Sequence, residues 1–384
     1  GGPEAQSLGT QVRALIRDDL MASRYFKTLD PTPGADPADP EPWKKAGAAF
    51  TLSGRVSLDA GRASVTVKLG DLASGEAALE RYYRQDAKFW RSVAHRISDD
   101  IVKQLTGKPG IAHTQLAFVN DQSGSKELYV VDYDGEGLRR LTSDRSITLL
   151  PRWSPDGKRV AYTSYKHNNP DLLEINLEKG STRVLSGRQG LNLAGGFSPD
   201  GNRLVMTLSQ QKNPNIYQLD LGDLSAKALT SHFGVESSPT YSPDGNQVAF
   251  VSDRSGNPQV HILDLATGRI RRLTSLNWCD SPSWSPTGEW IVFAGRANNK
   301  DPMDLFVIDI TGSQLRQLTH GEGSNEDPAW SPDGRFISFT STRGGASGQP
   351  PKRRRRLYVM DADGSAPRLV LDPPGNSFTP SWSP

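Results

Sequence analysis

The sequence predicts a small α/β domain followed by an all-β, six-bladed β-propeller with four-stranded blades, in which the C-terminal strand closes the ring. Three observations lead to this prediction. An aromatic-Ser-Pro core recurs six times at intervals of 43 to 52 residues, a period typical of propeller blades or of helical repeats. The residues between the cores alternate like strands. The residues before the first core instead combine two helical patterns with strands.

The repeated core is a strand end followed by a tight turn. In Ser-Pro-Asp-Gly, Ser accepts a hydrogen bond, Pro fixes φ, and Gly takes the positive φ that follows. Because an aromatic residue precedes this turn in every unit, we expect it to pack between neighbouring blades; the alternative is a sugar or peptide site. The aromatic residues are Trp153, Phe197, Tyr241, Trp284, Trp330 and Trp382.

Each unit also contains three further strand patterns. Second strands include "RVAYTS" at 159–164, a third is "VHILDL" at 260–265, and a fourth is "IRRLT" at 270–274. Helices of ten or more residues do not fit these runs. The repeat therefore favours four antiparallel strands per blade over a helical solenoid.

The last repeat is incomplete, because "SFTPSWSP" at 377–384 supplies only a first strand. Residues 114–121, 127–135 and 138–142 match the second, third and fourth strands of a blade. Five complete units and these two fragments make six blades. We expect residues 377–384 to pair with the N-terminal fragment and close a propeller spanning residues 110–384.

Residues 1–109 predict a small α/β domain of two helices on a sheet. One helical pattern covers 10–26, with Thr10 available as an N-cap, and the other covers 88–105 and stops at Gly107. Between them lie a Pro-rich loop and three strand patterns, at 31–42, 48–58, 62–70 and 76–85.

Composition excludes several classes of function. Lys and Arg number 45 and Asp and Glu 43, a net charge of +2 that does not indicate nucleic acid or an anionic membrane as the main partner. No stretch has the length of a transmembrane helix, and "GGPEAQSLG" lacks the regions of a signal peptide. Cys279 is the only cysteine, which excludes an intrachain disulfide and thiolate zinc sites.

The combined motifs resemble a known family. The α/β domain ends in "AHRISDDIVKQLTGKPGIAHTQLAFVND", blades with "P-x-W-S-P-D-G" and "LT" follow, and the chain closes on "WSP". This order is similar to that of TolB, the periplasmic component of the Tol-Pal system of Gram-negative bacteria. The resemblance extends over essentially the whole chain. The blade motif occurs in many propellers, whereas its combination with the "LTG" hinge and the N-terminal helix-strand order is much more specific.

The resemblance implies a periplasmic, non-enzymatic protein that associates with other proteins. It implies binding of the lipoprotein Pal at the propeller mouth, of TolA through the N-terminal segment, and of colicins that mimic Pal, in support of outer-membrane integrity and cell division. The family has an extended segment before the first helix, and only about nine residues stand there here, so TolA binding is the least supported of these expectations. We expect a monomer that binds no nucleic acid and does not insert into a membrane.

The loops that enter the aromatic strands should ring one end of the channel. Their residues vary in chemistry between blades, which favours partner recognition over packing. The candidate partner-binding residues are Leu149, Leu193, Glu236, Ser237, Asp280, Glu326, Asp327, Phe378 and, in a neighbouring loop, His320. An acidic sector beside an apolar sector would hold a peptide segment. Solvated loop acids are the simpler alternative, and Ca²⁺ held by oxygen ligands is the cofactor alternative to our expectation of none.

The enzymatic alternative is a propeller-type polysaccharide lyase, or another propeller enzyme, with a metal at the channel mouth. His232 and His320 are its only support, whereas a catalytic metal typically needs three protein ligands. Gly-x-Ser-x-Gly, Rossmann and Walker motifs are absent. The basic run "PKRRRRLYVM" at 351–360, including Arg353 to Arg356, is interpreted as a solvated loop that could also steer an acidic partner.

Overall fold

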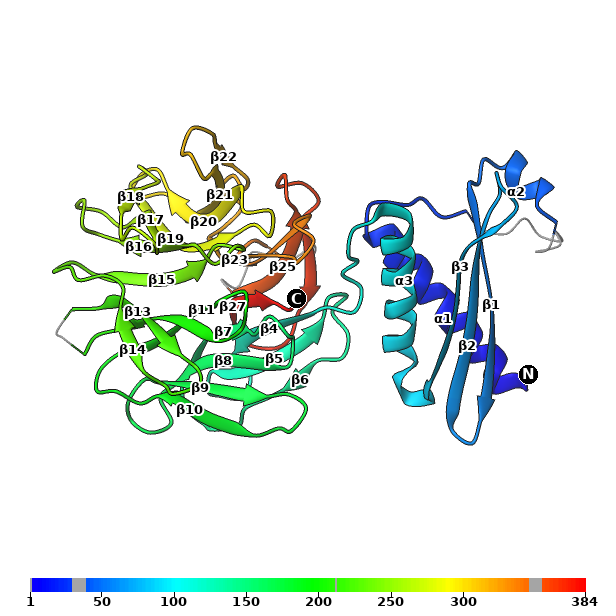
Figure 1. Cartoon of the computed structure of the whole chain (residues 1–384), viewed down its shortest axis with the longest axis horizontal. Coiled ribbons are helices and arrows are strands. Elements are labelled where there is room, and N and C mark those ends of the chain that lie inside the picture. The colour runs from blue at the N-terminus through cyan, green and yellow to red at the C-terminus, as the bar shows by residue number, and fades with distance from the viewer. Residues whose placement is uncertain (1, 30–38, 211–212, 345–353) are drawn as a thin grey trace. The chain divides into compact units, whose positions relative to one another are not determined.

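The computed structural model describes residues 2–29, 39–210, 213–344 and 354–384. The chain divides into two compact units, Gly1–His113 and Thr114–Pro384, which are shown in Figure 1 and described separately here. Within the described residues, none of the helices has the length and apolar character needed to cross a membrane.

The first unit packs helices against one antiparallel sheet. Its elements are α1 (Pro3–Ala22), α2 (Glu41–Lys45), β1 (Phe50–Asp59), β2 (Arg62–Asp71), β3 (Ala77–Asp86), the short 3₁₀ helix η1 (Ala87–Phe89) and α3 (Trp90–Thr106). The sheet order is β1-β2-β3, with β2 in the centre. The three strands and α3 lie within two residues of the predicted segments, and α3 ends at Gly107 with a φ of 71°, as predicted.

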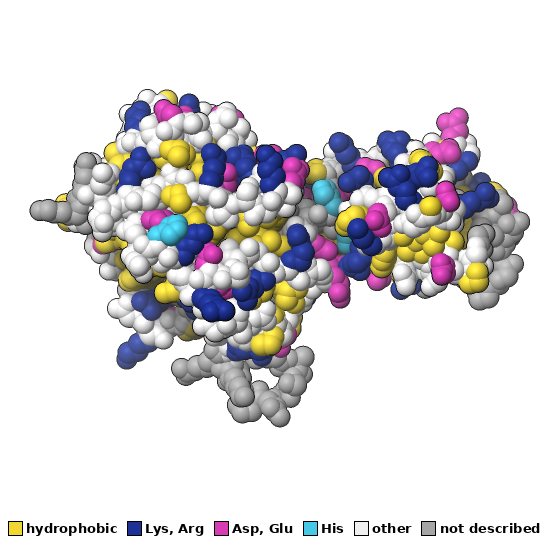
Figure 2. Space-filling model, turned by 90° about the horizontal axis from the view of Figure 1, so that it is seen from below, with side chains coloured by type: hydrophobic (Ala, Val, Ile, Leu, Met, Phe, Trp, Pro, Cys, Tyr) yellow, Lys and Arg dark blue, Asp and Glu magenta, His cyan; other side chains and the backbone are white. Residues whose placement is uncertain are grey.

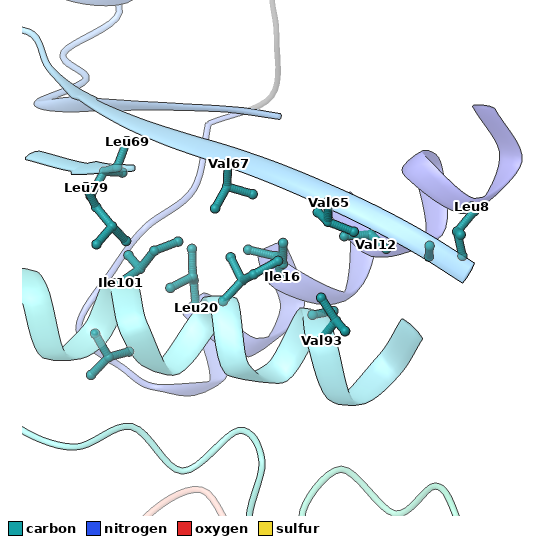
Figure 3. Close-up of a cluster of buried hydrophobic side chains, with 14 residues drawn as sticks. Leu8, Val12, Ile16, Leu20, Val65, Val67, Leu69, Leu79, Val93 and Ile101 are labelled. Carbon is teal, nitrogen blue, oxygen red and sulfur yellow. The ribbon is translucent and has the colours of Figure 1, made fainter. Parts of the chain in front are cut away.

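The core of this unit lies between the sheet and the two long helices. Leu8, Val12, Ile16 and Leu20 recur along one face of α1 and are all buried. Figure 3 shows these side chains, with those of α3, directed toward apolar side chains of the strands. Each fully buried aliphatic side chain contributes roughly 1.5–3 kcal/mol. A buried polar contact joins the same helices, because Ser98 Oγ donates to Asp19 Oδ2 over 2.8 Å.

The predicted start of the first helix is wrong. The helix begins at Pro3, and the hydroxyl of Thr10 donates to the carbonyl of Gln6 over 3.2 Å from within the helix, so Thr10 is not its cap. Pro at a first helical position needs no N–H partner. Gly9 lies inside the helix, where a Cβ would stand 3.7 Å from Val56 on β1. Part of the predicted loop at 31–42 lies outside the described residues, and its last two residues belong to α2.

The second unit consists, over its described residues, of six four-stranded antiparallel sheets. The first three sheets contain β7 (Thr148–Trp153), β8 (Arg159–Ser164), β9 (Asp171–Asn176) and β10 (Thr182–Ser186); β11 (Asn192–Phe197), β12 (Arg203–Leu208), β13 (Asn215–Asp220) and β14 (Ala226–Ala228); and β15 (Glu236–Tyr241), β16 (Gln247–Ser252), β17 (Gln259–Asp264) and β18 (Ile270–Arg272). Each sheet follows chain order, so each is a simple meander.

The other three sheets include one that joins the two ends of the unit. They contain β19 (Trp278–Trp284), β20 (Trp290–Arg296), β21 (Asp304–Asp309) and β22 (Leu315–Gln317); β23 (Asn325–Trp330), β24 (Phe336–Ser341), β25 (Arg356–Asp361) and β26 (Arg368–Leu371); and β27 (Ser377–Trp382), β4 (Gln115–Asn120), β5 (Glu127–Asp132) and β6 (Arg139–Arg140). The order of the last sheet is β27-β4-β5-β6, and Figure 1 shows β27 beside β4.

The segment 377–384 is fixed to β4 by more than the strand ladder. Ser383 N–H donates to the carbonyl of Gln115 over 2.8 Å, and Trp382 Nε1 donates to Thr114 Oγ1 over 2.8 Å. Just before the strand, the N–H of Asn376 donates to Asp121 Oδ1 over 2.6 Å. These contacts hold the segment at both ends.

The aromatic residues lie in cores shared between neighbouring sheets, as predicted. Trp153 packs with Leu128 and Val130 of β5 and with Val160 of its own sheet. Its Nε1 donates to the carbonyl of Ser381, on β27, over 3.1 Å. Trp330 likewise donates to the carbonyl of Ser283 over 3.2 Å. The aromatic residue therefore holds one sheet against another.

The Ser-Pro-Asp-Gly turns form as the sequence predicts. In the second sheet, Ser198 Oγ donates to Asp200 Oδ1 over 2.5 Å and accepts from Arg203 N–H over 2.9 Å. Gly201 has a φ of 71°, which a residue with a Cβ rarely adopts. The same serine-to-aspartate bond recurs at Ser242 and Asp244.

We predict that removing residues 377–384 destabilises the second unit. The deletion takes away the buried side chain of Trp382 and exposes the edge of β4. Trp382→Ala alone should lower the free energy of unfolding by about 3–5 kcal/mol, and the deletion by at least as much, measured by urea denaturation. Leu369→Ala, on the outermost strand β26 and 39% exposed, is the control and should change it by less than about 0.5 kcal/mol. An unchanged unfolding midpoint in the deletion variant would contradict this role.

We predict that acid destabilises the turns through their aspartates. Hydrogen bonds from Ser198 and Ser242 hold the pKa of Asp200 and Asp244 below the ordinary 3.8. Each carboxylate thus stabilises the fold above its unfolded-state pKa, and this contribution is lost as pH falls through the lower folded-state pKa. The double variant Asp200→Asn, Asp244→Asn should show a shallower fall in unfolding free energy below about pH 4.

The control for this prediction is Asp333, at the same turn position in the fifth sheet. Burial raises its pKa, so its contribution changes with pH in the opposite direction. Asp333→Asn should make the acid-side fall steeper. A double variant with the wild-type slope would rule out the turn aspartates as the cause.

Candidate functional site

The first strand of every sheet in the second unit carries a β-bulge just before its aromatic residue. The pairing register shifts there in β7, β11, β15, β19, β23 and β27. In five of them a non-glycine residue at the bulge has a φ between 46° and 55°: Leu150, Ser238, Ser281, Asp327 and Thr379. Such backbone conformations cost of order 1–3 kcal/mol and gather at functional sites. In β11, Gly195 and Gly196 follow Ala194 instead.

Proline follows each of these five residues, at Pro151, Pro239, Pro282, Pro328 and Pro380. Each of these strands is paired on one side only, at the end of its four-stranded sheet. Proline lacks an N–H and is therefore tolerated on an unpaired strand edge.

Side chains at the bulges form a chain of hydrogen bonds that crosses from sheet to sheet. Ser238 Oγ donates to Asp280 Oδ1 over 3.2 Å. Ser281 donates its N–H to Asp280 Oδ1 over 2.7 Å and its hydroxyl to Asp327 Oδ1 over 3.3 Å. Thr379 N–H donates to Asp327 Oδ2 over 3.2 Å. We call these residues, from Ser238 to Thr379, the polar girdle; it links β15, β19, β23 and β27.

Burial and mutual repulsion make the carboxylates of the girdle less acidic. Burial raises the pKa of Asp280, and the charges of Asp327 and Glu326 raise it further. Burial and then the charge of Glu326 raise the pKa of Asp327, while Arg355 and Arg152 oppose the shift. The structure thus brings Asp280, Glu326 and Asp327 together, as the sequence predicted.

Arg355 is the partner of this acidic group that the sequence interpretation missed. Its two terminal nitrogens donate to the Glu326 carboxylate over 2.8 and 2.9 Å, and Arg355 Nη1 lies 4.0 Å from Asp327 Oδ2. Arg355 belongs to the basic run that we interpreted as a solvated loop, of which 351–353 lie outside the described residues. Its neighbours Arg354 and Arg356 pair with Asp372. The topology could have indicated this contact. In an antiparallel sheet, the loop that follows the second strand lies at the same end of the sheet as the start of the first strand.

Glu236 does not lie on an exposed rim, which corrects its predicted placement. Its side chain is fully buried, and Oε1 accepts from Arg254 and from Ser252 Oγ. The reason is its position five residues before the aromatic, where every sheet buries the residue: Thr148, Asn192, Cys279, Asn325 and Ser377 are the equivalents. The sequence interpretation grouped Glu236 with residues that lie three or four positions before an aromatic, whereas Glu236 lies five positions before Tyr241.

The apolar sector is less open than predicted. Leu149, Leu193 and Ser237 are all partly buried. The Phe378 ring lies between two cations, with Lys126 Nζ 4.3 Å and the Arg355 guanidinium carbon 5.6 Å from its centre. Phe378 therefore contacts cations as well as the predicted apolar surroundings.

The loops entering the first strands expose other apolar side chains that the sequence interpretation did not select. Phe233 is 82% exposed, and Ile147, Val235 and Trp278 are also exposed. They flank the girdle at the same end of the sheets. Figure 2, a view of one face of the molecule, shows basic, acidic and hydrophobic side chains interspersed, in keeping with the small net charge.

The two candidate metal-binding histidines are separately placed. His232 Nδ1 accepts a hydrogen bond from the N–H of Gly234 over 3.0 Å. The side chain of His320 is exposed, and its backbone N–H donates to the Glu322 carboxylate. Within the described ranges, neither belongs to a group of three closely spaced ligand residues. This geometry gives the lyase alternative no support.

Meandering four-stranded sheets joined by shared aromatic cores define a repeat protein of the β-propeller class. The family model described as "TolB beta propeller domain" matches residues 102–303 and 276–350. Since these matches cover more than half of the sequence, the chain belongs to the TolB β-propeller family.

Individual relatives agree with this family. "Tol-Pal system protein TolB" of Desulfosudis oleivorans is 36% identical over 168 residues, which is 41% of this chain and 38% of that protein. The protein of the same name from Geobacter sulfurreducens is 35% identical over 167 residues, 42% of this chain and 39% of its own length. The matched segments span about two fifths of these relatives.

A solved structure is similar over nearly the whole chain. The crystal structure of TolB from Acinetobacter baumannii superposes with a TM-score of 0.83 and 28% identity, covering 97% of this chain and 93% of that one. The similarity therefore includes both compact units and not the repeats alone.

We predict that Glu236 is a structural residue. Arg254→Ala would leave its carboxylate buried without its cation and should lower the free energy of unfolding by about 3–5 kcal/mol in urea denaturation. Arg272→Ala, on the neighbouring strand β18 and exposed, should change it by less than about 0.5 kcal/mol. Equal stabilities of the two variants would exclude this role.

Proposed function

We propose that this chain is a non-enzymatic periplasmic component of a Tol-Pal system, which binds a Pal-like lipoprotein at one end of a six-bladed propeller. The observation that carries the proposal is the similarity to the Acinetobacter TolB structure over 97% of the chain. The family assignment and the relatives named as Tol-Pal proteins support it. In this role the protein supports outer-membrane integrity and cell division.

The proposed propeller is a closed ring of six blades. Each first strand contacts the next one in the series β7, β11, β15, β19, β23 and β27, and β27 contacts β7 again. The turns repeat this order, because a Cβ on Gly201 would lie 3.7 Å from Pro155 of the preceding turn, and one on Gly157 would lie 3.5 Å from Pro384. Both series support closure through residues 377–384.

The proposed docking surface is the end of the propeller that carries the girdle. Its centre offers the partly buried carboxylates Asp280, Glu326 and Asp327, and its surroundings offer exposed apolar groups such as Phe233 and Trp278. An apolar and aromatic contact area with oriented charges suits a protein partner. We further propose that colicins use the same surface, that TolA binds the N-terminal segment, and that the protein is a monomer.

Partner binding in this proposal requires no cofactor. Arg355 already neutralises Glu326 through two hydrogen bonds, which removes one of the carboxylates that a Ca²⁺ site would use. Calorimetry with and without Ca²⁺ distinguishes the two alternatives.

We predict that purified Pal binds the full chain at micromolar concentration or tighter in titration calorimetry. The double variant Asp280→Ala, Glu326→Ala should bind at least tenfold more weakly, a loss of about 1.4 kcal/mol. Thermal unfolding of the variant shows whether the fold is intact. The control variant is Lys158→Ala, in an exposed turn at the opposite end of its sheet, which should bind like the wild type.

Two outcomes count against the proposal. If Pal does not bind with or without Ca²⁺, the assignment to a Tol-Pal system loses its support. If Pal binds and the double variant binds equally well, the docking surface lies elsewhere on the molecule.

A further inference from the structure

The residue directly before each aromatic occupies an equivalent position in the six first strands, five of these residues line one cavity, and one of the six is unlike the others. These residues are Arg152, Gly196, Thr240, Ser283, Ala329 and Ser381. Five are small and leave space; Arg152 is long and positively charged. A cavity of about 170 Å³ is lined by Arg152 together with Thr240, Ser281, Ser283, Asp327 and Thr379, among others. Its wall is therefore polar and carries one cation and one carboxylate.

Arg152 is half-buried and has no carboxylate partner that offsets its loss of solvent. Among the described residues, its guanidinium donates to the carbonyl of Pro151 over 2.8 Å and forms no ion pair. Burial lowers its pKa, and Asp327 opposes this only as a charge at a distance. A guanidinium has five N–H donors in a planar fork that matches a carboxylate. Most of these donors are therefore available to a ligand in the cavity.

Another part of the cavity wall, formed by Asp327 and Thr379, supplies acceptors. Asp327 accepts from Ser281 and from the N–H of Thr379, and a carboxylate has about four lone-pair positions in all. Thr379 Oγ1 is buried and, in the part of the chain that the structure describes, has no hydrogen-bond partner. A cationic or hydroxyl donor would satisfy both groups. The cavity wall thus carries both a positive and a negative side chain.

We propose that this channel cavity binds a small zwitterion, with its carboxylate on Arg152 and its ammonium group on Asp327. One water molecule needs roughly 10–15 Å³ of such volume, so the cavity holds on the order of ten non-hydrogen atoms, enough for a small amino acid. The positive charge of Arg152 disfavours a bare divalent cation in the same space. This site shares Asp327 with the centre of the proposed partner surface, but the proposal does not require that a protein partner binds there.

The test is calorimetry of the full chain with three organic probes, L-alanine, acetate and methylammonium, and with Ca²⁺ in a separate titration. We expect alanine to bind most tightly, acetate more weakly and methylammonium weakest, because only alanine offers a carboxylate to Arg152 and an ammonium group to Asp327. Arg152→Gln should weaken binding of alanine and acetate at least tenfold. Asp327→Asn should weaken binding of alanine and leave acetate binding intact. Arg316→Gln, outside the cavity, is the matched control and should bind all three like the wild type.

The folding of each variant is checked by thermal unfolding, and Arg152→Gln is not expected to unfold because it removes an unpaired buried charge. Three results would overturn the proposal: no binding of alanine at about 10 mM, alanine binding that is unchanged in both variants, or preferential binding of Ca²⁺ that does not respond to Arg152→Gln. Loss of alanine binding in a folded Arg152→Gln protein supports it, whatever the result with Pal.

Discussion

Every sheet of the second unit has to be covered on both faces. The second strands show this requirement: β8, β12, β16 and β20 bury five successive residues each, so both faces of these strands are away from water. A four-stranded sheet alone cannot satisfy this condition, and a row of sheets would leave its two end faces exposed. Only a ring gives each sheet two neighbours. The shared aromatic cores and the pairing of β27 with β4 are consistent with the proposed ring.

The same arrangement determines where chemistry can occur. Packing between sheets demands similar residues in every repeat, and the aromatic positions obey this demand. The bulged segments before them pack less uniformly: Leu150 contacts a core shared by two sheets, whereas other repeats carry polar side chains there. As a result, a carboxylate, a serine, a leucine and a threonine occupy equivalent positions in different sheets. The girdle is a local feature on a nearly symmetric frame.

Most of the fold could be predicted from the sequence, because the responsible interactions are local or repeated. The turn chemistry at Ser198 to Gly201, the alternation of the strands and the end of α3 at Gly107 all depend on neighbouring residues. The start of α1 could not be predicted in this way. Gly9 suggests interruption of a helix, yet the helix runs from Pro3 through Gly9, where a Cβ would lie 3.7 Å from Val56 on β1.

The site was predicted in part, for a related reason. Counting back from the aromatic residues located Asp280, Glu326 and Asp327, because the repeat fixes the position of each residue along its first strand. The count could not show which way a side chain turns, and Glu236 proved to be buried beside Arg254. Ion pairs between distant segments, such as Arg355 with Glu326, leave no local pattern. Arg152 carries no signal in the sequence, because only the three-dimensional structure shows that it lines a cavity without an ion-pair partner among the described residues.

The prolines of the first strands limit the backbone hydrogen bonds that these strands can offer to a ligand. An unpaired strand edge normally offers alternating N–H and C=O groups, which invite another chain to add itself as an extra strand. In five of the six first strands a proline and a left-handed residue interrupt that row. Backbone-to-backbone recognition is therefore interrupted along these five strands, whereas β11 carries Gly195 and Gly196 at the same place. A ligand of the proposed channel would therefore depend mainly on side chains, and these can change one at a time without altering the sheets.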